Sequence, residues 1–424
     1  MLFKIPRLYD SHTHFLATGE FAAGLNLAEL KNPHELRNIN TANPNYFRNE
    51  WLVGFGWNDA SWTEAPNKKI LDELYPTTPV FFAKSDGHRS WVNSMALSKL
   101  NITSDDGILI EKDHLQAWEA LPSFNSIQSK NIILKACSVY NQGGFTHVRD
   151  MSCTEDLWNS LVQMSDRQEL TLAIEENFTV HEISEIESAI DFCKCAKKSE
   201  TNLVRMKGIK IFYDGSLGSE TAYLSKSYFG KEDGQRGQTL WKIEEVEDVM
   251  RRTWFAGLEF SIHCIGDEAA HEVVQAARKI SAQGAVGRLN LEHVQVLRPE
   301  TIQMMKPLHV RCHMQPCHWL SDRVWLKDKL SSLYAYAFPW ESLRAAKIPL
   351  SFGCDSPIEP PSVWRNKLAL EESPKDQIKK FNGDWIQFHS HPDSLFADSF
   401  SVIEDGIVSQ VVFCGQEILT KKAP

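Results

Sequence analysis

The chain has 424 residues, of which 42% are hydrophobic and 24% charged, a composition typical of a soluble globular protein with a large buried core. Its net charge is −10, and no basic run could follow a phosphate backbone. No apolar stretch reaches the roughly 18 residues needed to span a bilayer, so we expect neither nucleic acid nor membrane as a partner. The N-terminus lacks a long apolar segment, and the nine scattered cysteines lack CxxC spacing. Both features favour a cytoplasmic protein with reduced thiols.

Short β-like runs alternate with helical stretches along most of the chain. After an opening strand that leads into His12, seven further runs are typical of strands, at residues 143–152, 170–180, 204–215, 258–267, 288–296, 309–316 and 348–357. Amphipathic stretches between them are typical of helices, at residues 182–198, 267–280 and 299–308. Eight strands with intervening helices predict an α/β fold, the (β/α)8 TIM barrel.

Two segments exceed what a barrel needs, since a TIM barrel occupies about 250 residues. Most of the surplus lies between the first and second predicted strands, where a segment at 45–125 containing several tryptophans and prolines is expected to form an inserted subdomain. Residues 396–419 alternate like two or three strands around an Asp-Gly turn and predict a small C-terminal sheet. We therefore expect the barrel at 6–380 and a β segment at 381–424.

Two histidines, His12 and His14, end the first predicted strand. Side chains two residues apart on a strand point to the same side, so both can face the barrel mouth. The spacing is weak by itself because it recurs at His389 and His391. We interpret that second pair as surface or turn histidines.

Three more potential ligands end other predicted strands. His263 ends LEFSIH, His293 ends RLNLEH, and Asp355 ends IPLSFGCD. Imidazole and carboxylate are the usual zinc ligands, and TIM-barrel active sites lie at the C-terminal ends of the strands. A buried core histidine is the commoner explanation for any one of these residues but not for all of them together. The pattern predicts a divalent metal site, with zinc the expected metal.

Several longer motifs occur in a fixed order: DSHTH, KIFYDGSLGSETAYL, IHCIGDEA, LEHVQ followed by MQPCH, and CDSPIEPP. Together with GFGWNDASW and DGHRSWVNSMALSKL in the inserted segment, they resemble the metal-dependent amidohydrolase superfamily. The resemblance is strongest to its YtcJ-like branch, which includes N-substituted formamide deformylases. It implies that His12, His14 and Asp355 bind one metal ion and that His263 and His293 bind a second.

The resemblance also implies that Lys210 is carboxylated and bridges the two ions. An ammonium cannot ligate a cation, so Lys210 must be neutral or a carbamate to serve. A single-metal site beside a cationic Lys210 stays open. Members of this superfamily usually begin with strands of a β-sandwich, whereas only about seven residues precede the first strand motif here. The C-terminal sheet is therefore expected to be a reduced remnant of that sandwich.

The implied activity is hydrolysis of a carbon–nitrogen bond outside peptides, in an amide, formamide or cyclic amide. A bound dication lowers the pKa of water toward about 7, so that metal-bound hydroxide attacks the carbonyl. Asp355 would act as base and then as acid, with His293 and Lys210 completing the catalytic set. One alternative is a deaminase of an aminated heterocycle, because the same hydroxide can attack an amidine-like carbon. A metal-binding pseudoenzyme is an alternative from another class.

Contacts to a small-molecule substrate are expected from four side chains, His88, Asp214, His318 and Trp57. The two histidines lie in segments that match the family, although loop histidines are common. Asp214 can also be a simple turn residue, and Trp57 can be ordinary core. Glu220, where the family usually has arginine, favours a cationic or neutral substrate unless it only opens a helix. A homodimer is left open.

Overall fold

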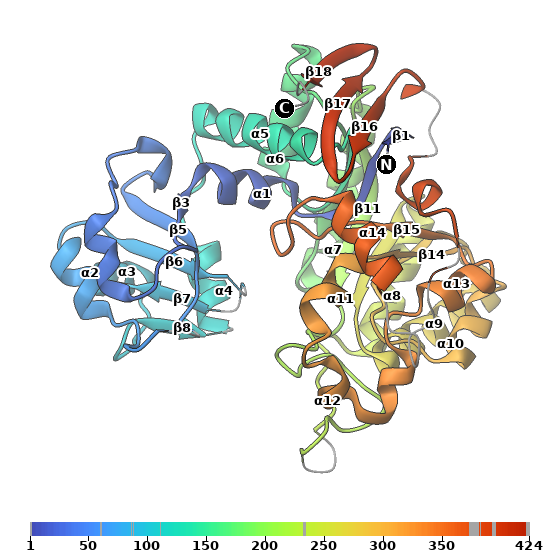
Figure 1. The fold of residues 1–424 in the computed structure, drawn as a ribbon. Helices are drawn as coiled ribbons and strands as arrows, with labels where there is room; N and C mark the ends of the chain where they lie inside the picture. Colours follow the sequence, from blue (N-terminus) through green and yellow to red (C-terminus); the bar gives the residue numbers. More distant parts are fainter. Residues whose placement is uncertain are drawn as a thin grey trace. The chain divides into compact units, whose positions relative to one another are not determined.

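The computed structural model describes residues 2–420, apart from 60, 61, 86, 88, 111, 232–234, 373–380, 382 and 392–395. The chain divides into two compact units (Figure 1). One comprises Met1–Phe15 and Tyr140–Pro424, and the other comprises Leu16–Val139. The second unit therefore begins before and ends after the 45–125 segment.

The first unit is built on an eight-stranded parallel sheet in the order β15-β14-β13-β12-β11-β10-β9-β2. Its strands are β2 (Tyr9–Thr13), β9 (His147–Cys153), β10 (Ala173–Thr179), β11 (Val204–Phe212), β12 (Glu259–Cys264), β13 (Leu289–His293), β14 (Val310–Met314) and β15 (Leu350–Phe352). The two ends of this order meet where Asp355 N donates to His12 O at 2.9 Å. The predicted TIM barrel is confirmed, and each predicted barrel strand is present.

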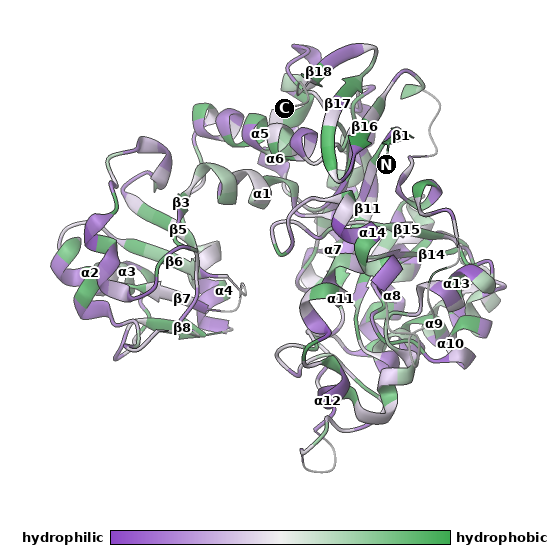
Figure 2. Cartoon of the chain, viewed as in Figure 1, coloured by the Kyte–Doolittle hydropathy of each residue, from purple (hydrophilic) through white to green (hydrophobic). Residues whose placement is uncertain are grey.

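Helical segments follow the barrel strands along the chain. The α-helices are α6 (Glu155–Asp166), α7 (Ile186–Lys198), α8 (Ile243–Phe255), α9 (Asp267–Ala282), α10 (Pro299–Met305), α11 (Pro316–Asp322), α12 (Leu326–Leu330), α13 (Trp340–Ala345) and α14 (Val363–Glu372). Short 3₁₀ helices are η3 (Ile183–Glu185), η4 (Ser331–Tyr336) and η5 (Trp385–His389). Green and purple positions mix along these helices (Figure 2), because one face of an amphipathic helix packs on the core and the other meets water.

Capping residues and apolar spacing in the sequence explain where such helices begin, as α6 shows. Thr154 caps α6, its hydroxyl accepting from Leu157 N at 3.2 Å, which satisfies one of the free N–H groups of the first turn. Leu157, Leu161 and Met164 then recur at helical spacing and are buried. The predicted helices at 182–198, 267–280 and 299–308 are likewise confirmed as α7, α9 and α10.

The barrel lumen is polar rather than filled by the bulky branched apolar residues usual in this fold. Arg149 on β9 donates to Ser261 Oγ on β12 at 2.6 Å and to Glu292 Oε1 on β13 at 2.9 Å. Strand β9 is adjacent to neither β12 nor β13 in the sheet, so the contacts of Arg149 cross the lumen. Buried polar groups are stable only when their hydrogen bonds are made, and this network makes them.

A four-stranded antiparallel sheet completes the first unit. It runs in the order β1 (Leu2–Pro6), β16 (Phe400–Glu404), β17 (Ile407–Phe413) and β18 (Gln416–Thr420). Asp405 and Gly406, at φ 47° and 85°, form the tight turn between β16 and β17. The predicted C-terminal strands are confirmed, and the first residues of the chain supply a fourth strand to them.

The interpretation of His389 and His391 as surface or turn histidines is wrong. His389 is fully buried and His391 is 7% exposed. His389 Nε2 lies 3.1 Å from Asn366 Nδ2, and His391 Nε2 lies 3.2 Å from Glu175 Oε1. Burial lowers the pKa of His389 to about 4, so this imidazole is neutral. The Nδ1 of His389 also contacts the nearby carbonyl of Trp385 at 3.0 Å, whereas the partner of His391, Glu175, is far away in the sequence, which a local pattern does not reveal.

The second unit has its own mixed sheet, in the order β3-β5-β6-β7-β8 with β4 beside β5. Its strands are β3 (Leu25–Asn26), β4 (Phe47–Arg48), β5 (Trp51–Trp57), β6 (Val80–Lys84), β7 (Arg89–Val92) and β8 (Ile108–Ile110). Its helices are α2 (Lys68–Leu74), α3 (Ser94–Leu100), α4 (Lys112–Glu119), η1 (Pro33–Asn38) and η2 (Pro44–Tyr46), while α1 (Phe15–Ala23) and α5 (Ser126–Gln142) run across its boundaries.

Strand β5 explains how this unit builds a core on both faces of its sheet. Trp51, Val53 and Phe55 belong to one hydrophobic cluster, and Leu52 and Trp57 belong to another. The pairing register shifts between Phe55 and Trp57, which places Trp57 on the side of Leu52 and breaks the strict alternation of a strand.

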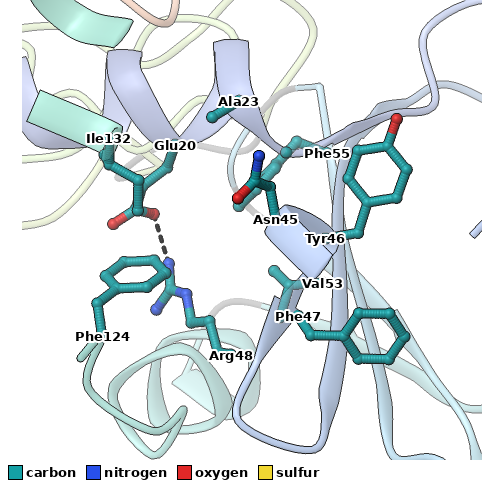
Figure 3. A pocket seen from close by; sticks show the side chains of 11 residues that line it. Glu20, Ala23, Asn45, Tyr46, Phe47, Arg48, Val53, Phe55, Phe124 and Ile132 are labelled. Atoms are coloured by element: carbon teal, nitrogen blue, oxygen red, sulfur yellow. Dashed lines mark hydrogen bonds and ion pairs between the residues drawn. The ribbon is translucent and has the colours of Figure 1, made fainter. Parts of the chain in front are cut away.

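A small pocket lies in the same unit (Figure 3). Glu20 and Arg48 form a buried ion pair there, and the Arg48 guanidinium lies 4.2 Å from the centre of the Phe124 ring. The two opposite charges neutralise each other inside this unit. Within the described part of the chain, no helix is both long and apolar enough to cross a membrane.

Candidate metal centre

The predicted ligands gather at the C-terminal ends of the barrel strands. They comprise His12 at the end of β2 with His14 just after it, Lys210 on β11, His263 on β12, His293 on β13, and Asp355 just after β15. Among the described residues, His12, His293 and Asp355 present ligand atoms that all lie within 4.8 Å of one another. All three are buried.

Closure of the barrel brings the first barrel strand and the residues after the last barrel strand together in this cluster. Asp355 N donates to His12 O and His14 N donates to Ser356 O, both at 2.9 Å. A Cβ atom on Gly353 would lie 2.6 Å from His12 N, closer than real side chains approach. Glycine at 353 therefore permits the close contact between β2 and the end of β15.

The backbone is left-handed at two of these positions. His293 has φ 71° and Asp355 has φ 59°, values that cost energy for any residue other than glycine and that concentrate at functional sites. At His293 this turn ends the alternation of β13. As a result, both Glu292 and His293 contact predicted ligands, although neighbouring strand residues normally face opposite sides.

Asp355 lies among three imidazoles. Its Oδ1 is 3.4 Å from His12 Nε2 and 3.3 Å from His14 Nε2, and its Oδ2 is 3.6 Å from His318 Nε2. Burial opposes ionisation of this carboxyl, but the contact with His12 and the neighbouring imidazoles outweigh it and hold its pKa well below the usual range. Asp355 is therefore an anionic ligand candidate at neutral pH.

Within the described residues, five buried polar atoms at this end of the barrel make no hydrogen bond: His12 Nε2, Lys210 Nζ, His263 Nδ1, His318 Nε2 and Asp355 Oδ1. Most buried polar atoms in folded proteins have a partner. The set consists of imidazole and amine nitrogens and one carboxylate oxygen. Apart from His318 Nε2, which carries a proton because Gln295 Nε2 donates to Nδ1 of that ring, these atoms are donors that fit a divalent cation such as zinc.

His263 and His293 are neutral, as metal ligation requires. Burial and the charge of Lys210 lower the pKa of His263 to about 3. Burial, with the charge of His12, lowers the pKa of His293 well below its usual value. His293 Nδ1 contacts Gln315 Oε1 at 2.8 Å, so it carries the proton and leaves Nε2 as the ligand atom. The two rings lie 4.5 Å apart between centres.

Lys210 is fully buried, with its Nζ 4.4 Å from the centre of the Phe212 ring. Burial lowers its pKa to about 8, although the charges of Glu292 and Asp355 oppose the change. The lowered pKa enlarges the fraction of neutral amine, which is the form that reacts with CO₂. This environment is compatible with the carbamate that the family resemblance implies.

Each predicted histidine ligand also has a second contact that the sequence did not suggest. His12 Nδ1 lies 2.6 Å from Glu292 Oε2, and His14 Nδ1 contacts Ser152 Oγ. His263 Nε2 lies 3.1 Å from the carbonyl of Gly215. In the sequence, Glu292 stands beside His293 in LEHVQ. Because neighbouring strand residues normally face opposite sides, the motif alone gave no reason to place Glu292 at the site.

Three of the four predicted substrate residues are described by the structure, and they lie in different environments. His318, on α11, faces Asp355, and its Nδ1 accepts from Gln295 Nε2 at 3.0 Å. Asp214 is 1% exposed and accepts backbone N–H groups from residues 223, 265 and 266, so it anchors loops. Trp57 is 1% exposed in the core of the second unit, and its Nε1 donates to Phe82 O at 2.8 Å. His88 lies outside the described residues.

Two consequences follow for substrate recognition. Asp214 and Trp57 have almost no exposed surface, so we do not propose them as substrate contacts. Glu220 forms ion pairs with Lys231 at 3.0 Å and Lys329 at 3.5 Å, and contact with Lys231 lowers its pKa. Its charge is thus neutralised within its own loop region, and it carries no argument for a cationic substrate.

Fold and site together define a class, the metal-dependent hydrolases built on a TIM barrel. A family model described as the amidohydrolase family matches residues 4–367, and the chain belongs to this family. It is 28% identical to the putative amidohydrolase YtcJ of Bacillus subtilis (strain 168) over 403 residues, covering 88% of this chain and 74% of the relative. It is 24% identical to the protein LONG AFTER FAR-RED 3 of Arabidopsis thaliana, covering 94% and 73%.

A solved structure shows the same fold. An uncharacterized metal-dependent hydrolase from Pyrococcus furiosus matches with a TM-score of 0.74 at 23% identity, covering 89% of this chain and 80% of that one. Family and fold therefore agree with the resemblance drawn from the ordered motifs.

Proposed function

We propose that this protein hydrolyses a non-peptide carbon–nitrogen bond of a small molecule, in an amide, formamide or cyclic amide, with zinc as its metal. The observation that carries the proposal is the position of the ionised Asp355 carboxylate, within 3.6 Å of His12, His14 and His318. A metal-ligand set alone suits many hydrolases. A carboxylate that faces both the ligand set and an additional imidazole donor suits proton transfer during C–N cleavage.

We assign the metal to the residues at the strand ends. His12, His14 and Asp355 would hold one ion, His263 and His293 a second, and a carboxylated Lys210 would bridge them. When bound, the metal supplies Lewis acidity toward the carbonyl and lowers the pKa of water from about 15.7 toward 7.

The residues of the chain then account for orientation and proton transfer. Asp355, ionised at neutral pH, takes the proton of the attacking water and returns it to the departing nitrogen, which leaves as the amine. Burial lowers the pKa of His318 despite the nearby charge of Asp355, so this imidazole is neutral. Because Gln295 donates to its Nδ1, the proton of His318 lies on Nε2 and can be donated to the substrate oxygen.

The proposal is tested with protein grown in zinc-supplemented medium and a substrate panel. N-formyl amines and lactams form one arm, and aminopyrimidines and aminopurines, followed by ammonia release, form the other. We expect turnover in the first arm and a loss of at least about 100-fold in kcat/KM for Asp355→Asn, the usual scale for a general acid–base group. Glu372→Gln, at an exposed ion pair with Arg323 on α14, is the matched control and should keep wild-type activity.

Three outcomes contradict the proposal. Ammonia release from the heterocycles without amide hydrolysis would make the protein a deaminase. Metal binding without turnover in either arm would favour the pseudoenzyme. Wild-type protein that retains less than about half an equivalent of metal would contradict the assigned ligands.

A further inference from the structure

Glu292 occupies an unusual position beside the proposed metal centre. It is fully buried on β13, directly before His293. One carboxylate oxygen, Oε2, lies 2.6 Å from His12 Nδ1, and the other, Oε1, accepts from Arg149 Nη1 at 2.9 Å. Two strands, β14 and β15, separate β13 from β2 in the barrel order. A short LEH segment thus supplies one predicted ligand and a carboxylate for another ligand across the lumen.

The contact with Glu292 determines which nitrogen of His12 carries its proton. A carboxylate only accepts hydrogen bonds when ionised, so Nδ1 of His12 must be the donor. The other nitrogen, Nε2, points toward Asp355 Oδ1 at 3.4 Å. A carboxylate on the far nitrogen of a ligand imidazole fixes its orientation and raises its basicity.

Arg149 holds the carboxylate in place. Its Nη2 donates to Ser261 Oγ at 2.6 Å, and its Nη1 also reaches the carbonyl of Ser11 at 3.2 Å. Ser11 is the neighbour of His12 in β2. The guanidinium is therefore fixed to the strand that bears His12. Because it holds Oε1 of Glu292, the other oxygen, Oε2, lies at His12 Nδ1.

We propose that Glu292, held by Arg149, is a positioning residue that keeps the proton of His12 on Nδ1 and aims Nε2 at the metal. The inference rests on the proposed function for the metal centre and adds a determinant of metal affinity that lies outside the ligand set. The competing explanation is that Glu292 only neutralises the buried Arg149.

Glu292→Gln separates these explanations. The amide has one acceptor, and if that oxygen bonds to Arg149, its NH₂ group faces His12 Nδ1. His12 must then carry its proton on Nε2, the atom that the metal needs. We expect the Kd for zinc, measured by chelator competition, to rise 10- to 100-fold. The visible absorption of the cobalt-substituted protein should also change, because it reports the ligand geometry.

Glu175→Gln is the matched control. Glu175 is a lumen carboxylate that accepts from Tyr9 at 2.9 Å and contacts His391 at 3.2 Å. Within the described part of the chain, its partners do not include the proposed metal ligands. This variant should keep the zinc Kd within about twofold of wild type and an unchanged cobalt spectrum, whatever it does to stability.

A folded Glu292→Gln protein with wild-type zinc affinity and cobalt spectrum overturns the inference. If wild-type protein itself binds no zinc, the proposed function fails instead, so the two failures are distinguishable. If Glu292→Gln does not fold, Glu292→Asp decides, because it keeps the charge beside Arg149 but draws the carboxylate back from His12. Weakened zinc binding by Glu292→Asp supports the inference, and unchanged binding overturns it.

Discussion

Lys210 shows how burial prepares one side chain for two different roles. A buried amine with a pKa of about 8 can serve as a cationic neighbour of one metal ion or, once carboxylated, as a bridge between two. The sequence identified the residue through the family motif. Its state depends on the local environment, because desolvation and neighbouring charges act only after the barrel has formed.

Replacement of this lysine distinguishes the two roles. We expect wild-type protein to hold two equivalents of zinc, and Lys210→Met to hold one or fewer with at least about a 100-fold loss of activity. Metal content is measured by plasma mass spectrometry after removal of free ions. A variant that retains the wild-type metal content would contradict the bridging role and favour the single-metal site.

The carboxylation step adds a pH dependence with a defined sign. Below a pH of about 8, Lys210 is mostly an ammonium that cannot react with CO₂. Bicarbonate-stimulated zinc uptake by chelator-treated protein should therefore increase as the pH rises through this value. Uptake that is insensitive to bicarbonate at every pH would contradict carboxylation.

The barrel strands also carry two buried carboxyl groups to which we assign no catalytic role. Asp150 on β9 and Glu176 on β10 are direct neighbours in the sheet register, and both are fully buried. Burial, together with the charge of Asp150, raises the pKa of Glu176 well above its usual value. Two carboxyl groups this close share a proton more readily than they both ionise.

This pair predicts how stability varies with pH. In the unfolded chain Glu176 loses its proton near pH 4.5, whereas in the folded protein it keeps the proton to a higher pH. At this site the folded state therefore binds more protons, and the contribution of Glu176 to stability falls as the pH rises above about 4.5. Glu176→Gln cannot ionise, so it should be more stable than wild type at pH 8 by at least about 1 kcal/mol.

The measurement is urea unfolding at pH 5 and pH 8. At pH 5 the two proteins should be similar, because Glu176 is protonated in the folded wild type. Glu372→Gln, an exposed carboxylate on α14, serves as the control and should parallel wild type. An equal free energy of unfolding for Glu176→Gln and wild type at pH 8 would contradict the raised pKa.

At the scale of the whole molecule, metal binding should stabilise the folded state. His12 lies on the first barrel strand, and Asp355 follows the last one. An ion bound between them would therefore stabilise the closed barrel. Ligands that bind only the folded state stabilise it by about 2.7 kcal/mol at 100 times Kd. We expect chelation to lower the Tm of wild-type protein and zinc to restore it.

The same coupling depends on pH. Burial opposes protonation of His12, but its contacts with Asp355 and Glu292 raise its pKa overall. A proton then competes with the metal for this ligand, so the zinc-dependent gain in Tm should shrink as the pH falls. Differential scanning calorimetry with zinc or chelator, at pH 6 and pH 8, checks this. The same gain at both pH values would contradict His12 as a ligand.

Much of the architecture was readable from the sequence. The eight barrel strands have period-two or continuous apolar patterns, and their C-terminal ends carry His12, His263 and His293. Because parallel strands deliver their C-terminal ends to one face, the sequence alone brought these residues together. The turn at Asp405 and Gly406 was likewise local chemistry and marked the C-terminal sheet.

Tertiary structure decided what depends on contacts between distant residues. The pairing of β1 with β16 joins the two ends of the chain, and His389 and His391 are buried by partners that their local pattern does not name. Glu292 acquires its contact with His12 because His293 adopts a left-handed backbone and because β13 faces β2 across a closed lumen. Sequence periodicity reports which face a residue prefers, whereas hydrogen bonds across the barrel exist only once the closed fold has fixed both partners.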